Sequence, residues 1–569
     1  MSSLFTPAVL QRPNKISTGP ILDMDAVEAL KERSFPLWVT NSNIVVDNNP
    51  ISFFDHKYLI PIYKDESPYI VIMKAAQMGA TVWLQLRLLW HCTYKPIKAS
   101  MYFPTKDSVE KMTKDRLNPL IYSNPSLCKL IDPRQDAVGL KRLVNGSSLY
   151  MNYLGGHVSK DSTPFDVIAI DEVRLVDPKD VDQVFERLSH SRHKIRYLAS
   201  TAGYPGTDID LRFGKTDQHF FHTKCGCPDG IRLAHEFPNC VAERSDGRIY
   251  LECPKCKTII KDPQEGRFIP WKKDNSIRGY HIHQLLSKFI TLEDIWLSYK
   301  TTTNIKEFYN AKLGLPYVEE DDYGVKDEDL AKCVRTDINW EDKDGDLGMG
   351  VDQMKGLNVV VIAKRYGNKK RIVHLEWIEE DNPFPRLYQL MAEYNIKLCV
   401  LDAMPNANEA LQFAKSFPNK VYLAYYHENV KDMVKWEDKR TPKIKKNKKY
   451  NTPDTRFQYK ALIQRYQSLD WTYQQFQRGL VEIPDPRKPI SDVTNSETGK
   501  KEKTLLCEQV YFSHLKCQVR EREVSDEKTH EYKIRWVDTK GIDPHFAHAT
   551  NYCFLCVEKI RPQFRYEFF

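Results

Sequence analysis

Short apolar runs that alternate with helical stretches constrain the fold of this chain more than any other feature of its sequence. Four runs in the first half are apolar enough to form buried strands: YIVIM (69–73), SMYFP (100–104), FDVIAID (165–171) and IRYLAST (195–201). The segment VWLQLRLLWHC (82–92) predicts a helix behind the first of them. Short apolar strands separated by helices are typical of a parallel α/β sheet, so we expect an α/β fold.

A second pattern of this kind begins at LGMGVDQ (347–353) and continues with an apolar hairpin and the run KLCVLDA (397–403). Between the two patterns, EEDDYGVKDEDL (319–330) is acidic and lacks apolar periodicity, which is typical of a linker. The lysine-rich stretch 435–454 predicts a mobile loop. We therefore divide the chain into four segments: an N-terminal arm or lead-in segment (1–50), a first domain (51–318) with a cysteine-bearing insertion (about 220–262), a linker (319–345) and a second domain (346–569).

Composition excludes several classes of protein. With 41% hydrophobic and 28% charged residues, this chain of 569 residues is too apolar for a disordered protein. It has no window of about 18 apolar residues and no charged start followed by an apolar core, so we expect neither a membrane span nor secretion. The net charge of +8 permits a nucleic-acid partner without requiring one. The 13 cysteines of a protein that is not exported are expected to be reduced thiols or metal ligands.

The turn between the first strand and its helix, KAAQMGAT (74–81), resembles a phosphate-binding loop. In the common form, G-x-x-x-x-G-K-[ST], backbone N–H groups and a lysine bind phosphates, and the final hydroxyl binds Mg²⁺. Gly79 and Thr81 fit this pattern, whereas Ala80 stands where the lysine belongs and Lys74 where the first glycine belongs. Taken alone, the segment is equally consistent with an ordinary strand-to-helix turn.

Two further motifs follow in the order that an ATPase requires. Asp171 and Glu172 close an apolar strand, which is the Walker B arrangement of a Mg²⁺-binding aspartate and a glutamate that polarises the attacking water. Ser200 and Thr201 end the next strand, where hydroxyls could sense the γ-phosphate. Acids at strand ends are common in α/β folds, so it is the ordered set of three motifs that predicts ATP hydrolysis.

Four cysteines in the insertion have spacing suited to tetrahedral zinc, in the pairs Cys225-Gly-Cys227 and Cys253-Pro-Lys-Cys256. A shell of four thiolates is closed, so the predicted zinc is structural rather than catalytic. Two neighbouring residues could replace one ligand, namely His222 and Cys240. The alternative is a set of plain reduced cysteines.

Three acids in the second domain could form a nuclease site: Asp352 within its first strand, Asp402 at the end of another strand, and Asp543 before a C-terminal helix. Carboxylates brought together from different elements can bind two Mg²⁺ or Mn²⁺ ions, which activate water for phosphodiester cleavage. The strand–hairpin–strand order suits a ribonuclease-H-like nuclease. His545 and His548 are candidates for tuning the site. The alternative is that these acids are solvated or cap a helix.

These motifs together resemble the large subunit of tailed-phage terminases, in particular the lambda-like GpA family, whose deviant phosphate loop carries its lysine at the start. The ATPase-like segments are MKAAQMGAT (73–81), FDVIAIDEV (165–173), YLASTAGYPG (197–206), RGYHIHQL (278–285) and EFYNAKLGLPY (307–317). The nuclease-like segments are MGVDQ (349–353), VLDA (400–403) and DPHFAHATNY (543–552). The resemblance covers roughly residues 50–569, with departures at the C-x-C pair and over 434–540.

The resemblance implies a RecA-like P-loop ATPase domain with a zinc-ribbon-like insertion, followed by a ribonuclease-H-like nuclease domain. It implies a motor that pumps double-stranded DNA through a portal protein into a procapsid and cuts concatemeric DNA. The expected cofactors are ATP with Mg²⁺, two Mg²⁺ or Mn²⁺ ions in the nuclease, and structural Zn²⁺. The expected partners are DNA, the portal protein, a small terminase subunit and further copies of the chain in a ring, in the host cell cytoplasm during phage assembly.

The resemblance also assigns roles to individual residues. Those expected to bind ATP and its Mg²⁺ are Lys74, Gln77, Gly79, Thr81 and Asp171. Those expected to act in catalysis are Glu172 for ATP hydrolysis and Asp352, Asp402 and Asp543 for DNA cleavage. Ser200 and Thr201 are expected to couple hydrolysis to movement, and an arginine from a neighbouring subunit could complete the ATP site. Candidates for that arginine are Arg187, Arg192 and Arg196.

Two other functions stay open from the sequence. One is an ATPase–nuclease of repair or of a mobile element, although the second α/β pattern lacks the arginine-bearing motifs of a helicase. The other is a non-catalytic, zinc-stabilised DNA-binding scaffold, which Ala80 favours and the intact acids oppose. Magnesium-dependent ATP hydrolysis and manganese-dependent nicking would distinguish these functions.

Overall fold

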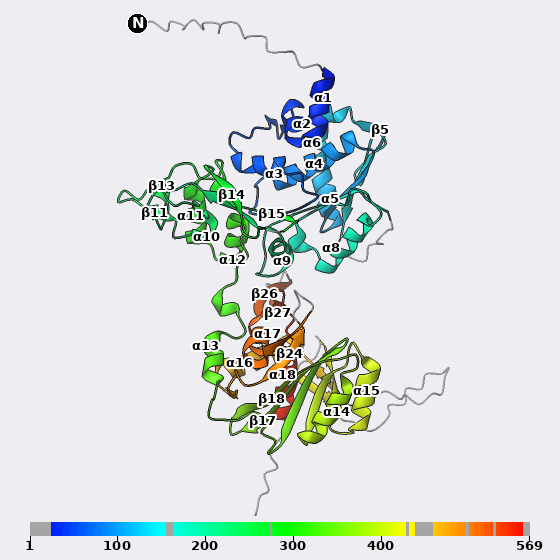
Figure 1. Cartoon of the computed structure of the whole chain (residues 1–569), viewed down its shortest axis with the longest axis vertical. Coiled ribbons are helices and arrows are strands. Elements are labelled where there is room, and N and C mark those ends of the chain that lie inside the picture. Colours follow the sequence, from blue (N-terminus) through cyan, green and yellow to red (C-terminus); the bar gives the residue numbers. More distant parts are fainter. Residues whose placement is uncertain are drawn as a thin grey trace, which may run out of the picture. The chain divides into compact units, whose positions relative to one another are not determined.

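A computed structural model describes residues 24–154, 163–273, 275–427, 432–437, 459–494, 500–526 and 531–560 (Figure 1). The chain forms two compact units, one of residues 1–203 and 208–315 and one of residues 204–207 and 316–569. Within the described ranges, no helix is both long and apolar enough to cross a membrane. The first 23 residues of the N-terminal arm and most of the predicted lysine-rich loop (438–454) lie outside the described residues.

The first unit contains a ten-stranded sheet in the order β14-β10-β15-β3-β9-β8-β4-β7-β6-β5. The strands from β10 to β7 run parallel, and β14, β6 and β5 run antiparallel to their neighbours. The bounds, in sheet order, are Gly266–Pro270, His219–Thr223, Arg278–Ile282, Tyr69–Lys74, Ile195–Ser200, Val167–Asp171, Lys98–Phe103, Ser148–Tyr153, Leu140–Leu143 and Ile131–Ala137. The α/β prediction and its four strands are confirmed.

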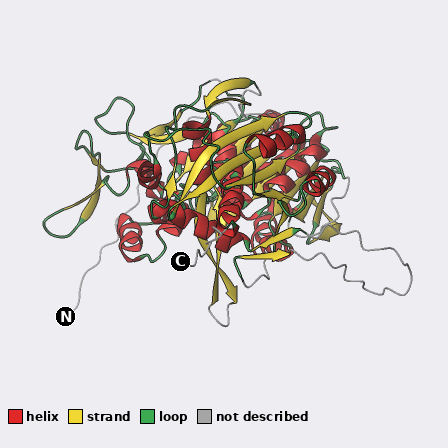
Figure 2. Cartoon of the chain, turned by 90° about the horizontal axis from the view of Figure 1, so that it is seen from below, coloured by secondary structure: helices red, strands yellow, loops and turns green. Residues whose placement is uncertain are grey.

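Helices cover both faces of this sheet because its central strands are apolar on both sides (Figure 2). On β3, Ile70 and Ile72 join the core beneath α4, whereas Val71 and Met73 join the core beneath α8 and α9. Alternate side chains of a strand point to opposite faces, which explains the uninterrupted apolar run. The helices of this unit are α1 (Met24–Arg33), α2 (Phe35–Asn41), α3 (Ile60–Lys64), α4 (Ala80–Tyr94), α5 (Lys106–Met112), α6 (Asn118–Tyr122), α7 (Pro125–Cys128), α8 (Pro178–Phe185), α9 (Asp208–Gly214), α10 (Leu233–Glu236), α11 (Leu292–Thr301) and α12 (Ile305–Phe308).

The cysteine-bearing insertion lies between β10 and β14, which pair with each other as antiparallel neighbours. It contains a three-stranded antiparallel sheet of β11 (Val241–Glu243), β12 (Ile249–Glu252) and β13 (Ile259–Ile260). Its small core joins Leu251 and Cys253 to Ile295 of α11 and Phe308 of α12. The insertion is therefore packed onto the unit through its own hydrophobic cluster.

The second unit contains an eight-stranded sheet in the order β21-β22-β20-β19-β16-β17-β18-β23. Strands β16, β17 and β18 form an antiparallel meander, and β19, β20 and β22 continue the sheet in parallel from β16. The bounds from β16 to β27 are Leu347–Met354, Leu357–Tyr366, Lys369–Glu379, Leu398–Asp402, Val421–Tyr426, Val434–Glu437, Lys460–Ile463, Val481–Glu482, Ile490–Thr494, Lys501–Leu505, Gln518–Asp526 and Glu531–Asp538. The predicted hairpin and the strand at 397–403 are confirmed.

Helices also cover the two faces of the second sheet. Buried residues of α14 (Phe384–Glu393) and α15 (Ala407–Ser416) pack on one side, and those of α16 (Arg465–Gln477) and α18 (His545–Lys559) on the other. Part of the predicted linker is ordered as α13 (Asp327–Cys333), whose Leu330 and Cys333 are buried in the core with α16. A short helix, α17 (Phe512–Lys516), precedes β26.

Two glycines let α18 lie against β16. A Cβ atom at Gly350 would stand 2.0 Å from the backbone oxygen of Ala549, and one at Gly348 would stand 2.8 Å from Cβ of Cys556. Because alternate residues share a face, Asp352 points to the same side of β16 as both glycines. Close packing of α18 on this face brings the start of the helix to the carboxyl end of β16.

Replacing Gly350 by Ala is expected to lower the free energy of unfolding of the second unit by about 3 kcal/mol or more, because the added methyl group overlaps the α18 backbone. Chemical denaturation of the purified variant measures this loss. Gly479→Ala is the control: it has φ +64° and open space around it, so about 1 kcal/mol is expected. Equal losses in the two variants would contradict the proposed packing constraint.

Candidate active sites

The turn between β3 and α4 has the backbone of an anion-binding loop. Gln77 (φ +59°) and Gly79 (φ +81°) are both left-handed, and Gly79 caps α4. The N–H groups of Ala75 and Ala76 donate to the carbonyl oxygens of Ile282 and Ala311. In the described structure, the N–H groups of residues 77–79 have no acceptor. Together with the start of α4 they are available to an anion such as phosphate.

A second segment, far along the chain, supports this loop from behind. Gln284 donates from Nε2 to the oxygen of Ala76 (2.9 Å). Gly314 (φ +65°) lies so close that a Cβ atom there would stand 2.6 Å from the nitrogen of Ala75. The segments RGYHIHQL and KLGLP therefore hold the loop in shape, a role that motif spacing alone does not reveal.

Thr81 and Asp171 meet beside the loop. The hydroxyl of Thr81 donates to Oδ2 of Asp171 over 2.7 Å. Burial raises the pKa of Asp171, and the positive charge of Lys74 opposes this rise. Two oxygens on adjacent positions of an octahedral Mg²⁺ lie about 3 Å apart, so this pair fits that cation without rearrangement.

Glu172 turns away from Asp171 toward Lys74. Its backbone is left-handed (φ +54°), which is uncommon for a residue with a side chain, and its N–H donates to Oδ1 of Asp171. Its carboxylate pairs with Nζ of the buried Lys74 at 3.3 Å. The two acids therefore face different groups, although they are adjacent in sequence.

The predicted coupling residues lie at the carboxyl end of β9, between β3 and β8. The hydroxyl of Ser200 accepts from the N–H of Arg174 (3.0 Å) and donates to the oxygen of Thr201 (2.8 Å). It thus ties the end of β9 to the turn after Glu172. The hydroxyl oxygen of Thr201 is buried and has no partner in the described structure. A buried hydroxyl without a partner is costly, so Thr201 is open to a ligand or a moving group.

The three arginines considered as a donor to a neighbouring site differ in their surroundings. Arg187 donates to the hydroxyl of Tyr102 (2.6 Å), and Arg196 stacks over Tyr69 and Phe185. Arg192 is exposed. Of these three candidates, Arg192 is therefore the one whose side chain is presented to the solvent.

A hollow of about 530 Å³ lies beside the loop, against Gly79 and Val82. Aromatic side chains line it: Phe53, His56, Tyr63 and the exposed Phe289, whose ring stacks on His56 at 5.2 Å. Its volume is within the ~300–1,000 Å³ typical of small-ligand pockets.

The four predicted zinc ligands form one cluster. The sulfur atoms of Cys225, Cys227, Cys253 and Cys256 all lie within 4.8 Å of one another. Thr258 lies beside the sulfur of Cys256 (3.3 Å) and lowers the pKa of that thiol to about 6. The candidate replacements are elsewhere: His222 contacts the oxygen of Asp229, and Cys240 donates to the oxygen of Leu233. The cluster fits a tetrahedral four-thiolate site.

In the second unit, the buried Asp352 lies near Asp402 at the carboxyl ends of the parallel neighbours β16 and β19. Burial and the negative charge of Asp352 raise the pKa of Asp402 to about 6. Burial also raises the pKa of Asp352. Two neighbouring carboxylates with raised pKa values favour a bound divalent cation, which would stabilise their charged forms.

Helix α18 adds two side chains to this pair. Nδ1 of His545 lies 2.8 Å from Oδ2 of Asp352, and the hydroxyl of Tyr552 donates to Oδ2 of Asp402 (3.2 Å). Burial alone would lower the pKa of His545, but the hydrogen bond and charge of Asp352 raise it. His548 contacts the hydroxyl of Tyr426 instead, and burial lowers its pKa to about 3. His545 therefore borders the acids, and His548 does not.

Asp543 lies at the edge of this group rather than inside it. Its side chain is 78% exposed, and Oδ2 is 4.0 Å from Nε2 of His545. Among the described residues, only the four cysteines form a group of three or more mutually close metal-binding atoms, so the three acids do not form a closed shell. Asp543 is still near enough for its charge to act on Asp352 and His545.

Three residues near the acids had not been predicted. Tyr552 lies on the face of α18 that carries His545, a spacing visible in the motif DPHFAHATNY. Arg465 begins α16, and its charge opposes the rise in the pKa of Asp352. Asp538 ends β27, and its pKa is raised by burial. Arg465 and Asp538 carry no sequence signal, because they lie in the poorly matched stretch.

Comparison with known proteins agrees with the motifs. Residues 62–271 match the model of the phage terminase large subunit gpA, ATPase domain, and this part of the chain belongs to that family. The large terminase of bacteriophage HK97 has the same fold, with a TM-score of 0.52, 10% identity, and 92% of this chain and 99% of that chain covered. The large terminase of a thermophilic bacteriophage, in complex with ADP, gives a TM-score of 0.30 at 12% identity, with 86% of this chain and 93% of that chain covered, which is too low to support an argument. No curated protein matches.

Proposed function

We propose that this chain is the large subunit of a viral DNA-packaging terminase, which hydrolyses ATP to move double-stranded DNA and cuts that DNA with a metal-dependent nuclease. The contact between Thr81 and Asp171 carries the proposal, since it joins the phosphate loop to the acid pair inside the gpA-family segment. The first unit is proposed to be RecA-like, and the second, with its meander and parallel strands, ribonuclease-H-like.

In the proposed ATP site, the N–H groups of residues 77–79 and Lys74 bind the phosphates, and the base lies in the hollow lined by Phe289 and His56. Thr81 and Asp171 would hold Mg²⁺, which neutralises phosphate charge when bound. Glu172 orients and deprotonates the attacking water once ATP draws Lys74 away from it. Thr201 is proposed to couple hydrolysis to movement, and Ser200 to transmit it to the turn at Arg174.

In the proposed nuclease site, Asp352 and Asp402 hold divalent cations, with Asp543 joining from the edge. Bound cations would supply an activated water and stabilise the leaving oxygen. His545 orients Asp352, and Tyr552 orients Asp402, so each acid presents a fixed lone pair to the site. The proposed partners are double-stranded DNA, a portal protein, a small terminase subunit and further copies of this chain in a ring, within the host cytoplasm.

The proposal is tested with purified full-length protein in two assays, ATP hydrolysis with Mg²⁺ and nicking of supercoiled plasmid with Mn²⁺. Both activities are expected in the wild type. Absence of both would favour the non-catalytic scaffold.

The four-cysteine cluster is proposed to bind one structural Zn²⁺ per chain. Cys253→Ser is expected to lose the metal and to lower the Tm of the first unit by about 5 °C or more, because a closed thiolate site contributes folding energy. Elemental analysis and thermal unfolding measure the two effects. Cys128→Ser, at an exposed cysteine outside the cluster, is the control that should change neither. Wild-type protein without zinc after purification in zinc-containing buffer would contradict the proposal.

A further inference from the structure

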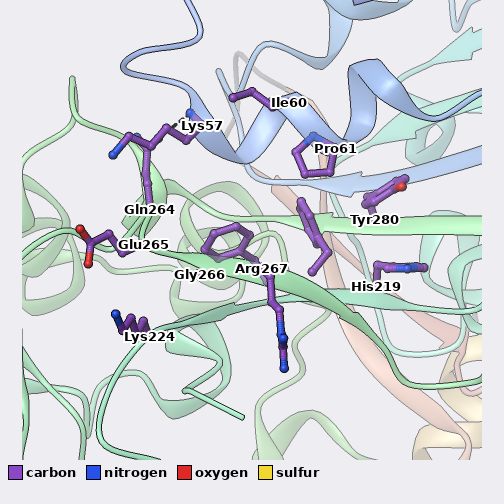
Figure 3. Close-up of a pocket in the computed structure, with 12 residues that line it drawn as sticks. Lys57, Ile60, Pro61, His219, Lys224, Gln264, Glu265, Gly266, Arg267 and Tyr280 are labelled. Carbon is purple, nitrogen blue, oxygen red and sulfur yellow. Dashed lines mark hydrogen bonds between the residues drawn. The ribbon is translucent and has the colours of Figure 1, made fainter. Parts of the chain in front are cut away.

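A recess of about 670 Å³ lies between α3 and the edge of the ten-stranded sheet, where β14 and β10 pair (Figure 3). None of its lining residues belongs to the phosphate loop, the acid pair or the cysteine cluster. Its volume falls within the ~300–1,000 Å³ range of small-ligand pockets. The recess is therefore a second candidate ligand site in the first unit.

The wall of the recess is aromatic. Phe221 and Phe268 have ring centroids 5.2 Å apart, Phe268 and Tyr280 5.0 Å, and Tyr280 and His219 5.2 Å. On the helix side, Ile60 and Pro61 face this wall (Figure 3). A slot with aromatic and aliphatic faces suits a flat ring, because stacking buries both faces of the ring.

The polar ends of this wall are already satisfied. The hydroxyl of Tyr280 donates to Asp65 (2.6 Å), and Nδ1 of His219 lies 2.9 Å from Asp217. Arg278 forms ion pairs with both aspartates, at 3.1 Å and 2.6 Å. These acids are neutralised by a cation and so do not exclude an anion from the recess.

The rim of the recess is cationic. Lys57, Lys224 and Arg267 line it against a single carboxylate, Glu265. Lys57 is paired with Asp262 (3.1 Å), whereas Lys224 and Arg267 are exposed and have no ion pair in the part of the chain that the structure describes. In Figure 3, Lys57 and Lys224 lie toward one side of the recess and His219 and Tyr280 toward the other. The two ends thus differ in chemistry, one charged and one aromatic.

We infer that this recess binds a nucleoside phosphate, with the base against the aromatic wall and the phosphate at Lys224 and Arg267. An aromatic slot next to free cations matches the two parts of such a ligand, a planar base and an anion. The same chemistry is offered by a free nucleotide and by one nucleotide unit of a nucleic-acid strand. This inference does not depend on the proposed ATP and nuclease sites, since it shares no residue with them.

The test compares Lys224→Ala/Arg267→Ala with a control of equal charge change, Lys106→Ala/Lys111→Ala, at exposed lysines of α5. Affinities for AMP are measured by calorimetry, and those for a ten-nucleotide single-stranded DNA by fluorescence anisotropy. Neither pair touches residues 74–81, so the difference between the variants reports on the recess. The recess variant is expected to bind one or both probes about tenfold more weakly than the control, since two charged contacts are lost.

The two probes distinguish the two sources of the ligand. Weakened binding of AMP alone assigns the recess to a free nucleotide, and weakened binding of the oligonucleotide assigns it to a unit of a strand. Equal affinities of the two variants for both probes overturn the inference. ATP hydrolysis, measured in parallel, is expected to continue at the wild-type rate in both variants, so a failure of the proposed ATPase is recognised separately.

Discussion

Glu172→Gln is expected to reduce the rate of ATP hydrolysis by at least ~100-fold, because an amide cannot accept the proton of the attacking water. ATP binding should persist, since the loop, Thr81 and Asp171 are unchanged. Loss of the negative charge also removes the ion pair that holds Lys74 at 3.3 Å, so the affinity for ATP is expected to stay equal or rise. Phosphate release and nucleotide binding measure the two effects.

The matched control for this variant is Glu186→Gln, at an exposed glutamate outside the proposed site. It should hydrolyse ATP at the wild-type rate. Unimpaired hydrolysis by Glu172→Gln would remove Glu172 from the mechanism. Loss of ATP binding together with hydrolysis would instead mean that the substitution disturbs the loop, and the assigned role would be wrong.

Asp352→Asn is expected to reduce manganese-dependent nicking by at least ~100-fold, because metal-bound transition states are stabilised by several kcal/mol. Asparagine keeps the shape of the side chain but removes its charge, in a buried position where a cation cannot be held without it. Plasmid nicking and Mn²⁺ binding by calorimetry should both be lost.

Asp346→Asn is the control for the nuclease, because Asp346 is an exposed acid just before β16. It should nick plasmid like the wild type. If Asp352→Asn retains nicking, the metal site lies elsewhere, and the raised pKa of Asp402 reflects burial alone.

The central strands of both units were predictable because their side chains are apolar on both faces. The run FDVIAID specifies a buried strand that ends in an acid, and β8 ends at Asp171. The edges were less predictable: β5 and β14 carry polar or charged residues, and their pairing depends on neighbours distant in the chain. Periodicity describes a strand but not its partner.

The site residues divide in the same way. Lys74, Thr81, Asp171 and Glu172 were found from spacing, because one loop and one strand end position them. The supporting contact of Gly314 joins segments more than 200 residues apart, so local patterns carry no trace of it. Arg465 lies near the second-unit acids for the same reason, through the packing of α16. Asp543 illustrates the opposite limit, since its motif was visible but its side chain lies at the edge of the site.

The central claim is that one chain holds two separate active sites. The most direct test measures ATP hydrolysis with Mg²⁺ and plasmid nicking with Mn²⁺ on the same preparations of wild type, Glu172→Gln and Asp352→Asn. We expect the wild type to have both activities, Glu172→Gln to lose only hydrolysis, and Asp352→Asn to lose only nicking. If either folded variant loses both activities, the division into two sites is wrong.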